Sequence, residues 1–254
     1  MSDEGSCAMA MDSLAADIPR PETGERIVIL TGAGVSAGSG LPTFRGPDGL
    51  WEGNRVEEVA TPEAWARDPV LVRRFYNLRR RALAKVTPNP AHLAIAQVQR
   101  NLGARLVTQN VDDLHERAGS PQVLHLHGIL TEARCDCGPA SVTGIGYRDL
   151  TKEDRCPRGH SLRPNVVWFG EPVPLFTQAC EWAAEADWLL IVGTSLLVYP
   201  AAALLHHASP SCRIVLIDPA PPPSVVPQPG HVWVLPIPAD CGVPSLLRHW
   251  SPLP

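Results

Sequence analysis

The sequence lacks an excess of basic charge. Its 254 residues carry 22 Lys and Arg against 26 Asp and Glu, which gives a formal net charge of −4. A protein that holds nucleic acid by its phosphates needs a basic surface, so we expect no nucleic-acid partner. The hydrophobic fraction of 44% is large enough to build a core of its own.

Long apolar runs are also scarce. Residues 1–25 contain none of the length that a signal peptide needs, so we expect a disordered tail over 1–24 and a cytoplasmic protein. One uncharged run, 188–205, reaches the lower limit of transmembrane length, but Gly193 and Pro200 divide it. A buried strand, a turn and the start of a helix fit this run better than a membrane span, and we expect no membrane partner.

Cysteines are too few and too unevenly placed for a disulfide framework. There are seven, an odd number, and Cys135, Cys137 and Cys156 lie close to His160 in the sequence. This grouping indicates a metal site in a reducing compartment.

Four short apolar runs predict strands of a parallel sheet. They cover 26–30, 104–110, 188–192 and 213–218, are rich in β-branched residues and do not alternate with polar residues, which is typical of strands covered on both faces. Helical segments are expected between them, including 89–101, where Leu93, Ile95, Ala96 and Val98 have helical spacing, and 176–186. The pattern predicts an α/β fold with a Rossmann-like, doubly wound sheet.

Two regions interrupt this alternation. Residues 50–86 are helical and strongly basic, with Thr61 as a cap and Pro62 at the first helical position. Residues 131–164 are rich in Gly, Cys, Pro and charge. We expect both to form a smaller lobe, while 25–49, 87–130 and 165–254 form the nucleotide-binding domain, with a ligand cleft between them.

Small and polar residues follow the predicted strands. Gly32, Gly34 and Ala37 have the spacing G-x-G-x-x-A, which permits a tight turn and close approach of the backbone to a pyrophosphate. A glycine-rich turn of any α/β protein is the alternative. Gly193, Thr194 and Ser195 form a second turn suited to phosphate, and Asp218 ends the last strand where a carboxylate could bind a ribose.

The second strand is followed by Gln109, Asn110 and Asp112, which could hydrogen-bond a carboxamide. The alternative is a helix N-terminus capped by Asn110 or Asp112. His127 lies further on, before a glycine, and a neutral imidazole there suits a general base. A single histidine is more often structural, and we interpret the neighbouring His125 in that way.

Five stretches together resemble one family. GAGVSAGSGLPTFRG, TQNVDDLHERAG, LHGIL, RPNVVWFGE and GTSLLVYP occur in the order and approximate spacing of the sirtuins, NAD-dependent protein lysine deacylases, and the resemblance extends from Glu25 to the C-terminus. It implies that an acyl oxygen attacks the ribose carbon bearing nicotinamide, and that lysine, nicotinamide and O-acyl-ADP-ribose are the products. An ADP-ribosyltransferase and a non-catalytic NAD or ADP-ribose sensor remain alternatives. The intact RPNVVWFGE stretch argues against the first, and His127 with Asn110 and Asp112 against the second.

The resemblance also assigns residues. It implies that His127 is the base, which takes a proton from a ribose hydroxyl, and that Val167 and Phe169 bind an extended peptide that adds to a strand. Phe44 and Arg45 would lie in a loop that folds over the cofactor. The full set implied for NAD is Gly32, Ala33, Gly34, Phe44, Arg45, Gln109, Asn110, Asp112, Gly193, Thr194, Ser195, Asp218 and Cys241. Many relatives have Asn where this chain has Asp218, which weakens that one assignment.

Two features indicate class III sirtuins of bacterial type. Thr43 follows Pro42, and Tyr76 and Arg79 lie three residues apart on one helix face. The resemblance implies that this Tyr-x-x-Arg pair recognises the distal carboxylate of succinyl-, malonyl- or glutaryl-lysine, which a guanidinium can bind with two hydrogen bonds. The alternative is a solvated basic face, because other arginines surround the pair: Arg73, Arg74, Arg80 and Arg81.

The expected zinc site departs from the family pattern. Sirtuins have two Cys-x-x-Cys pairs, whereas this chain has Cys135-x-Cys137 and Cys156 followed by His160. Three thiolates and an imidazole can complete a tetrahedral structural site, although the short first spacing should strain it. We expect zinc, with a metal-free knuckle as the alternative, and a monomeric enzyme that acts on acylated proteins.

Overall fold

A computed structural model describes residues 17–43, 54–137 and 142–250. Its centre is a six-stranded sheet in the order β3-β2-β1-β7-β8-β9, in which every neighbouring pair is parallel. This order is that of the Rossmann fold, so the predicted class is confirmed. The strands are β1 (Ile27–Thr31), β2 (Arg105–Thr108), β3 (Leu124–His125), β7 (Trp188–Val192), β8 (Arg213–Ile217) and β9 (Val232–Leu235).

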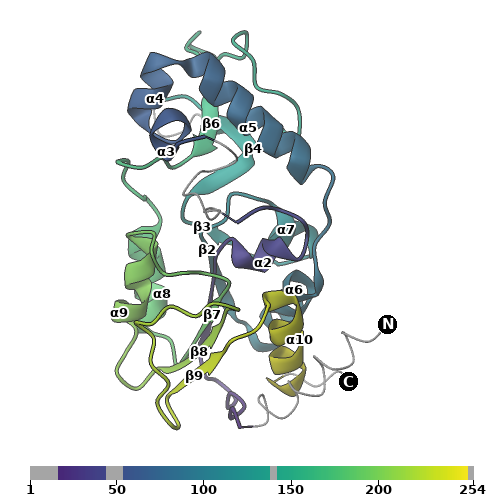
Figure 1. Cartoon of the computed structure of the whole chain (residues 1–254), viewed down its shortest axis with the longest axis vertical. Helices are drawn as coiled ribbons and strands as arrows, with labels where there is room; N and C mark the ends of the chain where they lie inside the picture. Colours follow the sequence, from purple (N-terminus) through teal and green to yellow (C-terminus); the bar gives the residue numbers. More distant parts are fainter. Residues whose placement is uncertain (1–16, 44–53, 138–141, 251–254) are drawn as a thin grey trace.

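Helices cover both faces of the sheet (Figure 1). The helices α6 (Pro90–Leu102) and α10 (Ala239–Trp250) lie on one face, and α8 (Phe176–Ala184) and α9 (Leu204–His207) lie on the other. Asn89 starts α6, because its side chain accepts hydrogen bonds from the first backbone amides of the helix, and Gly103 ends it at a φ of 66°. Both predicted helices are therefore present, although Leu93 of the expected apolar face is 53% exposed.

A smaller lobe lies beyond the carboxyl ends of the strands, at the top of Figure 1. Its helices are α3 (Val56–Val59), α4 (Pro62–Arg67) and α5 (Pro69–Leu83), and its strands β4 (Gly128–Arg134), β5 (Val142–Gly144) and β6 (Arg163–Val166) form an antiparallel sheet in the order β5-β4-β6. The Thr61 hydroxyl accepts a hydrogen bond from the Ala64 amide at 3.0 Å, which confirms the predicted cap.

The lobe boundaries differ slightly from the predicted ones. Pairing of Gly128 with Val166 draws a few residues before 131 and after 164 into the small sheet, because strand pairing and not composition sets its limits. Ile18, within the predicted tail, is fully buried among the residues under α10, and its carbonyl lies 3.2 Å from His249 Nε2. The ordered part of the chain thus includes residues before 25.

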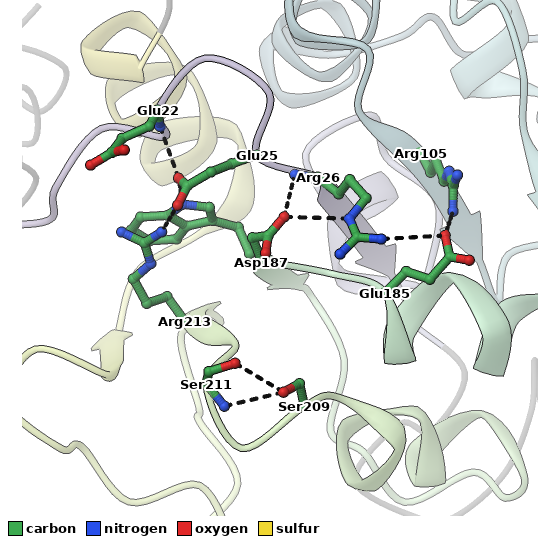
Figure 2. Close-up of polar contacts among 10 residues, drawn as sticks. Glu22, Glu25, Arg26, Arg105, Glu185, Asp187, Ser209, Ser211 and Arg213 are labelled. Atoms are coloured by element: carbon green, nitrogen blue, oxygen red, sulfur yellow. Dashed lines mark hydrogen bonds and ion pairs between the residues drawn. The ribbon is translucent and has the colours of Figure 1, made fainter.

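Ion pairs join the segment just before β1 to the amino edge of the sheet (Figure 2). Glu25 pairs with Arg213 and accepts a hydrogen bond from the Trp188 indole at 2.8 Å. Asp187 accepts the Arg26 backbone amide at 2.8 Å, which fixes the entry into β1.

The uncharged run of the sequence divides as expected into β7, a turn, a short 3-10 helix η1 (Ala201–Ala203) and α9. Among the described residues, none of the helices combines the length and the apolar character that a membrane span requires.

Candidate active site

A cavity of about 190 Å³ lies between the two lobes. Both lobes contribute to its wall, with α5 and the end of β6 on one side and the strand ends of the large sheet on the other. The predicted site residues that line it are Ala33, Tyr76, Arg79, Gln109, Asn110, Asp112, His127, Val167 and Phe169. Phe44 and Arg45 lie outside the described residues.

The two glycine turns contact each other where the strand order reverses. Gly34, which starts α2 (Gly34–Ala37), donates its amide to the Gly193 carbonyl at 2.8 Å. A Cβ atom on Gly34 would lie 2.7 Å from the Gly193 Cα, and Gly193 itself has a φ of +61°. Glycine is thus required for the crossing of the two turns, at the position where doubly wound sheets bind ligands.

The other predicted cofactor residues lie at the same carboxyl edge. Gln109 Nε2 donates to the Thr194 hydroxyl at 3.0 Å, which joins the ends of β2 and β7, and Ser195 beside it is exposed. The Asp218 carboxylate accepts the Ala220 amide at 2.8 Å, and partial burial raises its pKa. Cys241 is half-buried near the start of α10.

Ser36 connects the two polar side chains predicted to bind a carboxamide. Its hydroxyl donates to Asp112 Oδ2 at 3.0 Å and accepts from Asn110 Nδ2 at 3.1 Å. Burial raises the pKa of Asp112, whose other oxygen accepts the amide of Leu114 at 3.2 Å. Asp112 therefore contacts the first amide of α7 (Leu114–Arg117), but the N-cap residue of that helix is Asp113 and not the Asn110 or Asp112 of the alternative interpretation. The sequence analysis missed Ser36.

Two buried histidines underlie this pocket, and the sequence analysis missed them too. The rings of His92 and His115 lie 4.8 Å apart, and burial lowers the pKa of His92 to about 4 and that of His115 well below its usual value. Both rings are therefore neutral at pH 7. The signal was present for His92, which falls on the same face of α6 as Ile95 and Ala96.

His127 is held as a neutral imidazole. Its Nδ1 lies 2.9 Å from the Gln109 carbonyl, which can only accept a hydrogen bond, so Nδ1 carries the proton and Nε2 keeps its lone pair. Burial lowers the pKa of His127 and keeps the ring uncharged. Its own carbonyl accepts the Val167 amide at 2.9 Å, so His127 is joined to the segment predicted to bind peptide.

Tyr76 and Arg79 reach the cavity from α5. Tyr76 is fully buried, and its hydroxyl accepts the Trp168 indole N–H at 3.0 Å; burial raises its pKa. The Arg79 guanidinium lies 5.8 Å from the Phe75 ring. Arg80, which the basic-face interpretation placed in solvent, is fully buried and donates to the Leu130 carbonyl at 2.6 Å, so that interpretation is wrong for this residue.

The donor set predicted for zinc gathers in the small lobe. The ligand atoms of Cys135, Cys137, Cys156 and His160 all lie within 4.8 Å of one another, with 3.5 Å between the Cys137 and Cys156 sulfurs. A tetrahedral zinc with sulfur at about 2.3 Å separates its ligands by about 3.8 Å, so these residues fit the ion. The Cys137 amide donates to the Cys135 sulfur at 3.3 Å, which closes the short turn between these two residues.

The fold and this cavity define a dinucleotide-binding enzyme in which a neutral imidazole lies near a buried cluster of amide, carboxyl and hydroxyl groups. A family model described as "Sir2 family" matches residues 32–200, and the chain belongs to this family.

Similar proteins agree with this assignment. A protein of Aggregatibacter actinomycetemcomitans named "NAD-dependent protein deacylase" is 48% identical over 194 residues, which are 76% of this chain and 93% of the relative. The crystal structure of a Sir2 homolog–NAD complex matches with a TM-score of 0.80 and 39% identity, over 95% of this chain and 93% of the other. A structure of Sir2 bound to acetylated peptide matches with a TM-score of 0.71 and 26% identity, over 90% and 92%.

Proposed function

We propose that this protein is an NAD-dependent protein deacylase that removes acetyl and succinyl or malonyl groups from lysine side chains. One observation carries the proposal: the unprotonated Nε2 of His127 shares a single cavity with an amide-binding pocket and with the Tyr76 and Arg79 pair. The names of its relatives support the general activity, and the complexes with NAD and with acetylated peptide support the cosubstrate and the protein substrate.

NAD, when bound, supplies the ADP-ribosyl group that accepts the acyl group and releases nicotinamide. The chain offers a fitting cradle, since the glycine turns bring two backbones together at the switch point of the sheet. Gln109 and Thr194 would hold ribose and phosphate oxygens there. Asn110 and Asp112, fixed by Ser36, present the donors and acceptors that a carboxamide requires.

His127 would take a proton at Nε2 from a hydroxyl of the bound sugar. Because its Nδ1–H already donates to the Gln109 carbonyl, the ring cannot turn without losing that hydrogen bond. Preorganisation of this kind places the base before substrate arrives. The apolar lining of the cavity, which includes Leu130, Val166 and Trp168, would exclude water from the reacting groups.

Arg79 and Tyr76 would select acidic acyl groups. A succinyl chain that enters past His127 would meet the Arg79 guanidinium, which can bind its carboxylate with two hydrogen bonds, while an acetyl group offers no such partner. Tyr76 is held by Trp168, so its position is set before binding. This pair supports assignment to class III of the family.

The small lobe would be braced by zinc held by Cys135, Cys137, Cys156 and His160, and this ion would take no part in the chemistry. We also propose that the enzyme is a cytoplasmic monomer. All cysteines among the described residues are free thiols, which supports a reducing compartment. Neither ADP-ribosyl transfer nor ligand sensing is favoured by any feature of the cavity.

The experiment that tests the proposal is a panel of acetyl-, succinyl- and malonyl-lysine peptides, incubated with and without NAD and followed by mass spectrometry. Deacylation predicts a loss of the acyl mass that depends on NAD. A gain of the ADP-ribose mass, or no change in mass, would replace the proposal with one of the two alternatives.

A further inference from the structure

His125 is hydrogen-bonded to two acceptors at once. Its Nδ1 lies 2.9 Å from the Asn110 carbonyl oxygen, and its Nε2 lies 2.7 Å from Oε1 of Glu116. A carbonyl and an ionised carboxylate both accept hydrogen bonds and cannot donate them. Both ring nitrogens must therefore carry a proton, which makes His125 an imidazolium with only 12% of its side chain exposed.

The two histidines of the HLHG stretch thus hold two consecutive carbonyls. His127 donates to Gln109 and His125 donates to Asn110, each through Nδ1 at 2.9 Å. Since β3 ends at His125, the two rings lie at the edge of the sheet and meet the turn after β2. The His127 ring is neutral and the His125 ring is charged. Two histidines exposed to water would share the same protonation state, so the fold causes this difference.

The Asn110 backbone is held on both sides by this arrangement. Its amide donates to the Thr108 hydroxyl at 3.1 Å, its carbonyl accepts from His125, and its side-chain amide donates to Ser36 at 3.1 Å. Of these three, only the contact with His125 reaches the turn through a charged group. Removing it frees the peptide unit that leads from Asn110 towards Asp112.

The titratable groups that face His125 come from two elements. Glu116 and His115 belong to α7, and Asp112 belongs to the turn before it. Burial alone would lower the pKa of His125, but the hydrogen bond and charge of Glu116 raise it above the usual value, and Asp112 adds to this effect. In return, the charge of His125 favours the ionised form of Asp112, whose pKa burial raises.

We propose that His125 is a positioning residue, an imidazolium that bridges Glu116 and the Asn110 carbonyl and thereby holds the turn that carries Asn110 and Asp112 into the nicotinamide pocket. This inference rests on the proposed function, and it gives a reaction role to a histidine that the sequence marked as structural. The consequence is that the binding of NAD and of nicotinamide should depend on pH. The bridge forms below the raised pKa of His125 and is lost above it.

Two variants separate the bridge from its charge. His125→Gln retains one donor group and cannot reach both acceptors. Glu116→Gln allows a neutral ring to donate from Nδ1 to Asn110 while Nε2 accepts from the introduced amide, so the contact persists without the charge. His206→Gln and Glu153→Gln are matched controls, because both side chains are exposed.

We expect His125→Gln to raise the KM for NAD and the nicotinamide concentration for half-inhibition by about tenfold, as the loss of a charge-assisted hydrogen bond implies. The KM for the acyl peptide and the melting temperature should match those of His206→Gln. A folded His125→Gln protein with unchanged NAD and nicotinamide constants would overturn the proposal, because a merely structural histidine would leave them unaltered.

The pH profile tests the charge. In the wild type, kcat/KM for NAD should fall as pH rises through the raised pKa of His125, and this alkaline decline should be absent in Glu116→Gln and present in Glu153→Gln. An identical decline in both variants would contradict the bridge.

Nitrogen-15 NMR of the His125 ring measures the same property without turnover. Two protonated nitrogens at pH 7 are expected, and a neutral ring would overturn the proposal. If the wild type shows no deacylation at all, the proposed function fails, while the NMR measurement and calorimetry of NAD binding to His125→Gln still decide the role of His125.

Discussion

A single proton position makes His127 suited to its proposed role. The Gln109 carbonyl accepts from Nδ1, which leaves the Nε2 lone pair, and burial lowers the pKa of His127, which favours the neutral ring. We expect His127→Ala to reduce turnover by about a thousandfold, the usual size of a general-base contribution, and to leave NAD affinity within a few fold.

Calorimetry and a mass-spectrometric peptide assay check the two parts. His206→Ala, on the exposed side of α9, should behave as the wild type. Turnover by His127→Ala at the wild-type rate would remove the base assignment.

Arg79 gives a second test at one side chain. Arg79→Met should lower kcat/KM for a succinyl peptide by about thirtyfold or more, since hydrogen bonds to a carboxylate are worth about 2 kcal/mol. The acetyl peptide should lose less than threefold, as it has no second carboxylate. Arg74→Met, at an exposed position on the same helix, is the control. Equal losses on both peptides would indicate damage to α5 instead of lost acyl recognition.

The place of a side chain in the site could be predicted where it belongs to a sequence motif, and could not be predicted where it stands alone. His127, Asn110 and Asp112 follow a strand and a recognisable motif, so their meeting in one cavity was expected. Ser36 is one hydroxyl in a run of small residues, and nothing in the sequence says that it will lie between Asn110 and Asp112. His115 lies in a four-residue helix, too short to show which face is buried, whereas His92 could have been found from its place on the buried face of α6.

The crossing of the two glycine turns depends on backbone conformation. A Cβ on Gly193 would lie 2.4 Å from the Val35 amide nitrogen, and its φ of +61° is unfavourable for other residues. Gly193→Ala should lower the free energy of unfolding by about 2 to 4 kcal/mol and weaken NAD binding. Gly144→Ala in β5 is the control, because nothing lies within 4 Å of its added Cβ. Chemical denaturation and calorimetry measure both effects, and equal stabilities of the two variants would contradict the close contact.

The cysteine and histidine cluster of the small lobe predicts that the protein contains zinc. Purified protein should contain about one zinc per chain, and a strong chelator should lower its melting temperature, because binding energy at a structural site is folding energy. Cys137→Ala should lose the metal, whereas Cys180→Ala, in α8, should keep it. Less than about half an equivalent of zinc in freshly prepared wild type would favour the metal-free knuckle.

Buried strands were predictable because burial on both faces leaves a continuous apolar run, as in β1 and β7. The edge strand β3 spans only two residues, too few to show any pattern. The helix α10 contains Pro244, which from sequence alone argues against a helix at that point. The small sheet was missed because β5 and β6 are short and burial along β4 does not alternate from residue to residue.

The stability of the whole protein should decline in acid earlier than carboxylates alone would cause. The pKa of His92 is about 4 in the folded protein and 6.5 in the unfolded chain. Between these pH values only the unfolded chain binds the proton, so falling pH stabilises the unfolded state relative to the folded one. We expect a loss of about 3 kcal/mol between pH 6.5 and pH 4 from this residue. Below that range Asp154 adds to the loss, since its hydrogen bond with Arg148 lowers its pKa to about 2.

Urea unfolding at pH 7, 5.5 and 4.5 measures this decline. His92→Gln should be less stable at pH 7 but should lose less stability on acidification. A parallel decline in the variant and the wild type would mean that the pKa of His92 does not differ between the folded and the unfolded state.

The small lobe is joined to the large sheet by more than one passage of the chain. Within the described residues the backbone crosses after α5, before β4 and after β6, and the Leu130 amide donates to the Val111 carbonyl at 2.7 Å. These crossings and this hydrogen bond tie the small lobe to the large sheet at several points. If the proposed function holds, the acyl chain would enter the cavity between the lobes, and the position of Arg79 in its wall would limit the length of chain that fits.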